Sequence, residues 1–311
     1  MSSATPVLHT RLAGIALQNP ILLAAGTAAY GDELAGIIRL DSLGGLVTKA
    51  VSLEPRHGAP APRVAEFAGG MINAVGLANP GVSEVRDRHL PWLAAHLRQA
   101  RVVVNVVGYT VEDFAGVITH LRDAAGVHAF ELNVSCPNVK AGGLEFGADP
   151  AALADLVGRA ADATDLPLFV KLSPTLPDIA GTATLALRHG ATGITVVNTW
   201  PGRLIAVEQR RPALGFCTGG VSGPGLLPVG ILATWKVWKA TGAPIIGVGG
   251  IASATDALQY LIAGASAVGI GTAALRDPRL PERLVTELGA WCAAHGVDSI
   301  DSLRGSLEWP D

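Results

Sequence analysis

Short apolar runs alternate with longer segments of helical periodicity along the whole of this 311-residue chain. The runs are rich in valine, isoleucine and leucine, which is typical of strands that are buried on both faces of a parallel sheet. Because strands that alternate with helices indicate repeated strand-helix units, the sequence predicts an α/β fold. The eight candidate strands comprise residues 21–24, 45–48, 102–106, 129–134, 168–172, 193–197, 244–248 and 267–270.

Eight such units favour a closed (β/α)8 TIM barrel over an open doubly wound sheet. A barrel accommodates a chain of this length as one domain, so we expect residues 1–311 to form a single unit. The segments that we expect to be helical are residues 32–40, 111–125, 150–163, 177–189, 226–240, 254–263 and 281–295, with a further helix that starts near Val82.

Two connections, residues 50–81 and 199–225, are too long to be simple turns. Loops of this length in a compact domain are usually lids or binding loops. Both leave the C-terminal ends of predicted strands, and the active sites of TIM barrels lie at that end. We therefore expect long loops at the C-terminal face of the barrel.

Composition excludes several classes of protein. Hydrophobic residues make up 49% of the chain and charged residues only 16%, which excludes disorder. The formal net charge of -3 leaves no positive field to hold nucleic acid. No secretory signal is recognisable, and glycines and prolines interrupt the charge-free stretches, so we expect a cytoplasmic protein with no membrane association. The three cysteines show no CxxC spacing, which predicts neither a disulfide framework nor a metal site.

Polar side chains gather where the predicted strands end. Amides and lysines supply hydrogen-bond donors while apolar strands exclude water, which indicates a pocket for a polar, planar ligand. The alternative is that these residues cap the following helices, but capping does not require two lysines and several asparagines. The set comprises Gly26 and Thr27, Lys49, Asn105, Asn133 with Ser135 and Cys136, Lys171 with Ser173, Asn198 and Thr199, Gly249 and Gly250, and Gly271 and Thr272.

Many of the 38 glycines fall at these same strand ends. Residues 244–251 (PIIGVGGI) and 268–272 (VGIGT) end the last two predicted strands in glycine. Such glycines let backbone N–H groups approach an anion, and the loops after strands seven and eight form a recurring phosphate site in TIM barrels. Residues 219–223 (GGVSG) are a candidate third side of this cradle.

Cys136 is the cysteine that we expect to react. It follows a strand within the most distinctive segment of the chain, residues 131–143 (ELNVSCPNVKAGG). A free thiol has a pKa of about 8.5, so a modest local shift makes it a usable base or nucleophile. We expect Cys217 and Cys292 to pack as small hydrophobic side chains. No histidine has a spacing that pairs it with Cys136, and we expect His57 and the other histidines at the surface or in loops.

We expect the two lysines at strand ends to have different partners. Lys171 ends an apolar strand and must point into the mouth of the barrel, where it can form a Schiff base or stabilise an anion on a bound cofactor. Lys49 can pair with a substrate carboxylate or with the cofactor.

Together these motifs resemble class 1 dihydroorotate dehydrogenases, and the form SCPNVKAGG is similar to that of the class 1B catalytic (FMN-binding) subunit. The resemblance covers nearly the whole chain. The matching segments are residues 19–27, 47–63 (VTKAVSLEPRHGAPAPR), 71–82 (MINAVGLANPGV), 131–143, 170–174 (VKLSP), 197–199 (VNT), 218–224 (TGGVSGP), 244–251 and 263–273 (AGASAVGIGTA).

The resemblance implies that FMN binds at the barrel mouth and that dihydroorotate is oxidised to orotate in pyrimidine biosynthesis. Cys136 would be the general base that takes a proton from carbon 5 while a hydride passes from carbon 6 to flavin N5. The implied cofactor-binding residues are Ala25, Lys49, Ala50, Asn105, Asn133, Lys171, Val197, Gly223, Gly249, Gly250, Gly271 and Thr272. The implied substrate-binding residues are Lys49, Asn73, Ala74, Val75, Gly76, Leu77, Asn133, Asn138, Asn198 and Thr199.

Class 1B enzymes pass electrons through a second subunit, which carries FAD and a 2Fe-2S cluster, to NAD. The resemblance therefore implies a homodimer core of a heterotetramer with electron-transfer subunits. Two departures stand out: Ala25 lies where the family often has serine, and residues 213–217 are atypical. The alternatives are a related FMN barrel that acts on another dihydropyrimidine, a class 1A-like enzyme that uses fumarate, a Schiff-base aldolase and a non-catalytic phosphate-binding barrel.

Overall fold

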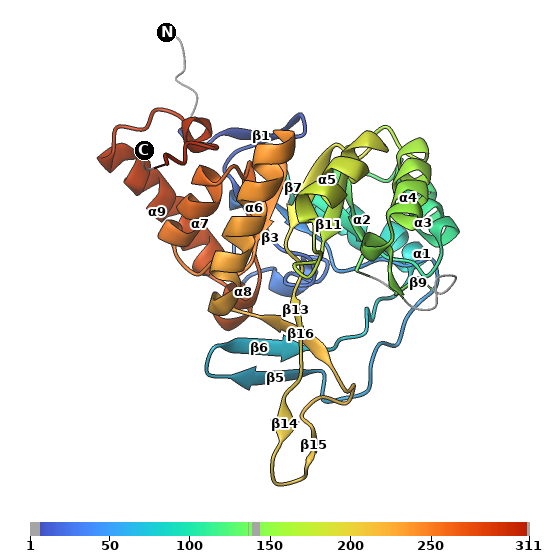
Figure 1. Cartoon of the computed structure of the whole chain (residues 1–311). Coiled ribbons are helices and arrows are strands. Elements are labelled where there is room, and N and C mark those ends of the chain that lie inside the picture. Colours follow the sequence, from blue (N-terminus) through green and yellow to red (C-terminus); the bar gives the residue numbers. More distant parts are fainter. Residues whose placement is uncertain (1–6, 136, 139–143, 310–311) are drawn as a thin grey trace.

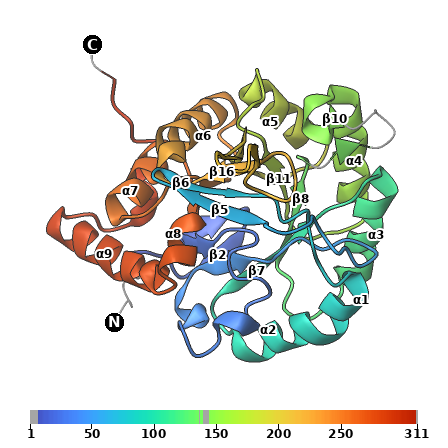
Figure 2. The same ribbon diagram turned by 90° about the horizontal axis from the view of Figure 1, so that it is seen from below.

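The computed structural model describes residues 7–135, 137–138 and 144–309, without the side chains of residues 137, 138 and 144. Eight parallel strands close into a barrel, with helices around its outside (Figures 1 and 2). Each strand lies within one residue of its predicted bounds, which confirms the TIM barrel. In barrel order the strands are β3 (Ile21–Leu23), β4 (Gly45–Val47), β7 (Arg101–Val106), β8 (Ala129–Asn133), β11 (Leu168–Leu172), β12 (Gly193–Val196), β17 (Ile245–Val248) and β18 (Ala267–Ile270).

Apolar side chains fill the N-terminal part of the barrel interior. Alternate residues of each strand point inward, and Val103, Ala129, Phe169 and Ile246 belong to one buried cluster there. The hairpin of β1 (Thr10–Leu12) and β2 (Ile15–Leu17) adds side chains to the same cluster and closes the N-terminal end. The barrel is therefore a packed core that opens only toward its C-terminal face.

Six α-helices occupy most of the segments predicted to be helical: α3 (Val111–Leu121), α4 (Pro150–Asp162), α5 (Ile179–Arg188), α6 (Leu227–Thr241), α7 (Ala254–Ile262) and α9 (Leu280–Ala294). The short helix α8 (Thr272–Arg276) was not predicted. The helix expected near Val82 comprises α1 (Val82–Glu84), a π-helical turn (Val85–His89) and α2 (Leu90–His96). The longest described helices have 15 residues, and none has the length and apolar character that crossing a membrane requires.

The helix predicted for residues 32–40 is wrong. The segment forms two 3-10 turns, Asp32–Leu34 and Leu40–Ser42, which are separated by Gly36 with a φ of 80°. A residue in that left-handed conformation ends any helical run that reaches it. The helix predicted for residues 111–125 is also shorter than expected, because α3 ends at Leu121.

The two long connections pair with each other in one antiparallel sheet. Its strands, in order, are β13 (Trp200–Gly202), β16 (Gly219–Ser222), β6 (Gly70–Asn73) and β5 (Val64–Phe67). The sheet lies across the C-terminal end of the barrel, where the long loops were expected, and the hairpin of β14 (Ile205–Ala206) and β15 (Arg211–Pro212) projects beyond it (Figures 1 and 2). These connections are thus not merely lids but an ordered cover of the barrel mouth.

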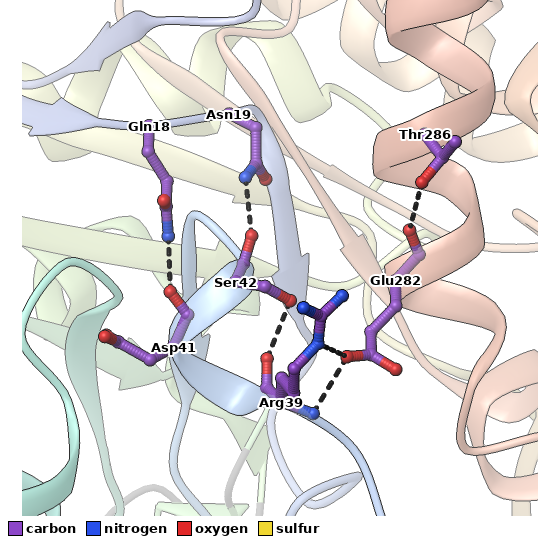
Figure 3. A network of polar contacts seen from close by, with 7 residues as sticks. All are labelled: Gln18, Asn19, Arg39, Asp41, Ser42, Glu282 and Thr286. Atoms are coloured by element: carbon purple, nitrogen blue, oxygen red, sulfur yellow. Dashed lines mark hydrogen bonds and ion pairs between the residues drawn. The ribbon is translucent and has the colours of Figure 1, made fainter.

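Polar side chains fasten the loop before β4 at the opposite end of the barrel (Figure 3). Gln18 donates from Nε2 to backbone carbonyls within residues 41–43, and Asn19 donates from Nδ2 to another at 2.9 Å. The guanidinium of Arg39 lies 3.2 Å from the carboxylate of Glu282 on α9. This network serves the scaffold, because it lies at the end remote from the mouth.

Candidate active site at the mouth of the barrel

The asparagines and lysine at the strand ends do not cap helices. The caps of α3, α4 and α5 are the side chains of Thr110, Asp149 and Asp178, which accept from the first backbone N–H groups of those helices. Asn133 instead lies directly opposite Lys171 across β8 and β11. The capping alternative therefore fails for this set, and the polar groups are available to a ligand.

Unpartnered polar groups face the mouth. The Lys171 side chain is only 7% exposed, and its ammonium forms no hydrogen bond or ion pair within the described part of the chain. Ser135 carries a buried hydroxyl that likewise lacks a partner among the described residues. Buried polar groups without partners are costly, so their presence together at one end of the barrel indicates a site built for a ligand.

A hydrogen-bonded network lies inside the barrel at the level of the polar strand ends. Asn105 donates from Nδ2 to Glu131 Oε1 at 2.7 Å, and Thr195 donates from its hydroxyl to Glu131 Oε2 at 2.7 Å. Neither Glu131 nor Thr195 was among the site residues predicted from the sequence. A signal was present, since Glu131 is a charged residue in an apolar strand, two positions before Asn133, and therefore points to the same inner face.

The predicted substrate-binding amides come together across three loops. Asn198 donates from Nδ2 to Asn133 Oδ1 at 3.2 Å and accepts from the backbone N–H of Thr199 at 2.8 Å. Asn73 on β6 donates to the backbone carbonyl of Gly220 on β16 at 3.2 Å. A side chain at Gly220 would collide with the hydroxyl of Thr199, so the glycine lets Asn73 and Thr199 approach the same strand.

The rest of the predicted substrate-binding run, Ala74, Val75, Gly76 and Leu77, forms the turn after β6. The backbone N–H of Ala74 donates to the carbonyl of Arg63, and the carbonyl of Val75 accepts from the N–H of Ala59. The structure thus places this turn in the cover of the mouth and shows no hydrogen bond from it to the amides among the described residues.

Cys136, the predicted general base, lies outside the described residues. The backbone of Asn138 is in β9 (Pro137–Asn138), which pairs with β10 (Leu144–Glu145). Lys49 follows β4, is half-buried, and donates its backbone N–H to Ala29 at 2.7 Å. Its ammonium has no partner within the described chain.

Free backbone donors line the glycine turns after β17 and β18. The N–H groups of Gly249, Gly250 and Gly271 donate to no described residue. Gly249 and Gly250 have φ values of 132° and 73°, which favour glycine strongly. A Cβ at Gly271 would meet no protein atom closer than 4.0 Å, so the space beside it is open. Unsatisfied N–H groups around open space are what an anion such as phosphate requires.

Side chains from other elements fix this cradle. The hydroxyl of Tyr260 on α7 donates to the carbonyl of Gly249 at 2.7 Å, and burial raises the pKa of Tyr260. Thr272 donates from its hydroxyl to Ser222 of β16 at 2.8 Å. Gly223, with a φ of 122°, follows Ser222 and lies against the backbone of the β5–β6 turn. The structure thus brings Ser222 and Gly223, which lie in the segment predicted as a third side of the cradle, beside Thr272.

Three apolar residues of the predicted cofactor set lie at strand ends: Ala25 and Ala50 follow the neighbouring strands β3 and β4, and Val197 follows β12. Ala50 is buried and its carbonyl accepts from the hydroxyl of Tyr30 at 3.1 Å. Burial, and then the negative charge of Glu33, raise the pKa of that tyrosine. Val197 is buried and Ala25, half-buried, follows β3. These residues supply a backbone wall rather than polar side chains.

An apolar pocket of about 360 Å³ adjoins the cradle. It lies between the cover sheet and the start of α6, and its walls include Phe67, Trp200, Gly223 and Leu226. The pocket thus lies beside Ser222 and Gly223, and none of the strand-end amides or lysines lines it.

Two sequence predictions about side-chain environment are wrong. His89 is 6% exposed rather than at the surface, because it stacks on Tyr30 with ring centroids 4.3 Å apart and lies 3.6 Å from Asp32. Cys217 is exposed because it belongs to the projecting loop after β15, whereas Cys292 on α9 is fully buried as expected. Burial raises the pKa of the Cys292 thiol, which agrees with a packing role.

Comparisons with known proteins agree with the geometry. Residues 7–291 match the family described as dihydroorotate dehydrogenase. A protein of Geobacter sp. (strain M21), named the catalytic subunit of dihydroorotate dehydrogenase B (NAD(+)), is 41% identical over 97% of this chain and 99% of its own length. A protein with the same name from Desulforudis audaxviator is 43% identical over 95% of each chain.

A Solibacter usitatus protein, with the provisional name dihydroorotate dehydrogenase A (fumarate), is 45% identical over 98% of this chain and 100% of its own length. The relatives thus differ in the electron acceptor that their names give and agree in the substrate. By its full-length similarity to these proteins and its match to the family, the chain belongs to the dihydroorotate dehydrogenase family.

Proposed function

We propose that this chain is the catalytic subunit of a class 1B dihydroorotate dehydrogenase, a flavin-dependent oxidoreductase that oxidises (S)-dihydroorotate to orotate in pyrimidine biosynthesis in the cytoplasm. One observation carries the proposal. Unpartnered ammonium groups of Lys49 and Lys171, convergent amides and a glycine cradle with free N–H groups all lie at one end of the barrel, within the part of the chain that the structure describes.

The residues of the mouth fit FMN. The free N–H groups of Gly249, Gly250 and Gly271 suit its phosphate, and the polar strand ends around Lys171 suit its ring. When bound, FMN supplies a hydride acceptor. Lys171 then offers an ammonium to the negative charge that accumulates on the reduced cofactor. The proposed cofactor set is the one that the resemblance implied, with Ser222 added through its bond to Thr272.

The substrate is a planar ring with alternating donors and acceptors and a carboxylate. The amides of Asn73, Asn133 and Asn198 offer both donors and acceptors, and Lys49 offers a cation for the carboxylate. Thr199 lies beside this group through its bond to Asn198. We place Asn138 and residues 74–77 in the same site on the strength of the resemblance alone.

Cys136 is the proposed general base. Its Sγ would accept the proton from carbon 5 of dihydroorotate, since Cys136 directly follows Ser135, whose hydroxyl has no partner in the described chain, at the end of β8. The hydroxyl of Ser135 can then donate to the substrate or to the thiolate. Water is kept from this chemistry by the sheet that covers the mouth.

Electrons then leave through a partner. The names of the Geobacter and Desulforudis relatives specify a catalytic subunit and NAD(+), which implies a separate subunit. The described residues contain no cluster of three or more His, Cys, Asp or Glu side chains that could hold a metal. On the strength of the resemblance we assign FAD and a 2Fe-2S cluster to the partner, with this chain as a homodimeric core. The Solibacter relative supports fumarate as the alternative acceptor.

Anaerobic titration with dihydroorotate tests the proposal. The purified chain should be yellow, and dihydroorotate should bleach it whereas dihydrouracil, which lacks the carboxylate, should not. The isolated chain should then reoxidise slowly with NAD. Rapid NAD reduction by the chain alone would refute the need for a partner, and rapid turnover with fumarate would establish the alternative acceptor.

A substitution tests the base. Cys136→Ser should retain orotate binding but reduce its flavin at least about a hundredfold more slowly, because a hydroxyl is a far weaker base than a thiolate. Cys217→Ser is the matched control, since the exposed Cys217 lies on the projecting loop, and it should behave as wild type. An unchanged reduction rate for Cys136→Ser would refute the assignment.

A further inference from the structure

Glu131 is a carboxylate with no exposure to solvent and no assigned role. It lies on β8 directly opposite Asn105 of β7, and its two oxygens accept from Asn105 and from Thr195, two strands further round the barrel. Both donors are only 1% exposed. Burying a charge is costly unless the charge is paired and hydrogen-bonded, and Glu131 has hydrogen bonds but no ion-pair partner in the described chain. The network therefore requires an explanation.

The carboxylate fixes the orientation of the Asn105 amide. An ionised carboxylate only accepts hydrogen bonds, so Asn105 must present its NH2 group to Glu131 and turn its Oδ1 the other way. That oxygen accepts from no described residue. Asn105 therefore offers the mouth of the barrel an acceptor of fixed direction.

Glu131 also balances a buried positive charge. Lys171 lies directly opposite Thr195 and Asn133, two positions along the strands from Glu131, and has no partner in the described chain. No described basic side chain forms an ion pair with Glu131 either. The carboxylate and the ammonium are thus carried on the inner faces of adjacent strands, and no described contact joins them.

We propose that Glu131 is a positioning residue of the cofactor site. It directs the Oδ1 of Asn105 toward the cofactor and places a fixed negative charge beneath the position where Lys171 meets it. The inference rests on the proposed function, since it assumes that FMN occupies the mouth. It predicts that the charge of Glu131 makes reduction of the bound flavin less favourable and that its hydrogen bonds strengthen flavin binding.

Glu131→Gln is the test, because it keeps the size of the side chain. The NH2 group of the glutamine can then donate to the hydroxyl of Thr195, which accepts as well as donates, so the Asn105 bond can survive while the charge is lost. We therefore expect the FMN affinity of the apo-protein to stay near the wild-type value in Glu131→Gln and to fall in Glu131→Asp, whose shorter side chain cannot reach both donors. The flavin reduction potential of Glu131→Gln should rise by about 30 mV or more, which is a tenfold shift in a two-electron equilibrium.

Two variants separate charge from structure. Glu131→Asp keeps the charge, so its potential should stay near the wild-type value even where FMN binds more weakly. Glu282→Gln makes the same chemical change in the network at the far end of the barrel (Figure 3), and should alter neither potential nor affinity. The potential is read with reference dyes and the affinity from quenching of flavin fluorescence.

The outcomes are distinct. A wild-type potential in Glu131→Gln together with a wild-type affinity in Glu131→Asp would overturn the inference and leave the proposed function intact. A rise in potential of about 30 mV or more in Glu131→Asp would overturn the charge argument. This measurement can be made even if Glu131→Gln fails to fold. A wild-type chain that takes up no FMN would overturn the proposed function and this inference together.

Discussion

Replacement of Gly250 by alanine tests the glycine cradle directly. Gly250 has a φ of 73°, and a Cβ there would lie 2.5 Å from the backbone nitrogen of Leu227 and 2.8 Å from its Cα and Cβ. Leu227 is the first residue of α6, so its backbone cannot yield without moving the start of that helix. The substitution therefore disturbs the proposed phosphate site without touching any of its polar side chains.

Two costs add in Gly250→Ala. An alanine in the left-handed region costs roughly 1–2 kcal/mol. Forcing an extra carbon into packed backbone costs roughly a further 1–3 kcal/mol. Gly242→Ala is the matched control, since Gly242 ends α6 with a φ of 61° and a Cβ there would meet nothing within 4 Å. It should show only the first cost.

Urea unfolding and FMN retention read out the two effects. We expect Gly250→Ala to lose about 2–5 kcal/mol of unfolding free energy and at least about tenfold in FMN affinity, and Gly242→Ala to lose about 1–2 kcal/mol with no change in affinity. Equal affinities in the two variants would refute the role of this turn in phosphate binding. Equal stabilities would refute the steric argument.

Three further predictions follow from single side chains. Lys171→Met should slow flavin bleaching by dihydroorotate at least about a hundredfold, because it removes the ammonium, without a partner in the described chain, that we assign to the reduced cofactor; a wild-type rate contradicts the assignment. Asp41→Ala should cost about 2 kcal/mol in urea unfolding, because Asp41 Oδ1 accepts from three backbone N–H groups of residues 98–100; a loss within error contradicts this. Burial, and then Arg101, lower the pKa of His128 from its usual 6.5. The unfolded chain then binds more protons, so stability falls as the pH drops from above 6.5 to below the folded value; His128→Gln should lose less stability than wild type between about pH 7.5 and 5.5, and an equal loss contradicts the reasoning.

The barrel could be predicted because its strands are buried on both faces. All five residues of β11 are buried, and only Lys171 among them is polar. The apolar run therefore marks the length and the ends of the strand in the sequence. Residues 32–40 lacked this clarity. Their apolar spacing suits a helix, yet Gly36 in a left-handed conformation divides them into two short turns, and only the tertiary structure selects that conformation.

The site was predictable at the strand ends and not within the barrel. Closure brings all strand ends to one face, so Asn105, Asn133 and Lys171 could be grouped from their positions in the sequence alone. Which of them bond to one another could not be predicted, because the bonds depend on barrel register. Glu131 reaches Thr195 across an intervening strand, 64 positions along the chain, and no local pattern indicates such a pair.

The pairing of the two long connections explains why the glycines are where they are. Strand β16 serves both ends of the site at once: Gly220 bonds to Asn73 and packs on Thr199 at the substrate side, while Ser222, two residues on, bonds to Thr272 at the phosphate side. A side chain at position 220 would push this strand away from Thr199, and the displacement would carry Ser222 with it. A displacement on the substrate side would thus reach the phosphate side through this one short strand. Its glycines are required because the neighbouring backbones approach closely, and not because the strand must be flexible.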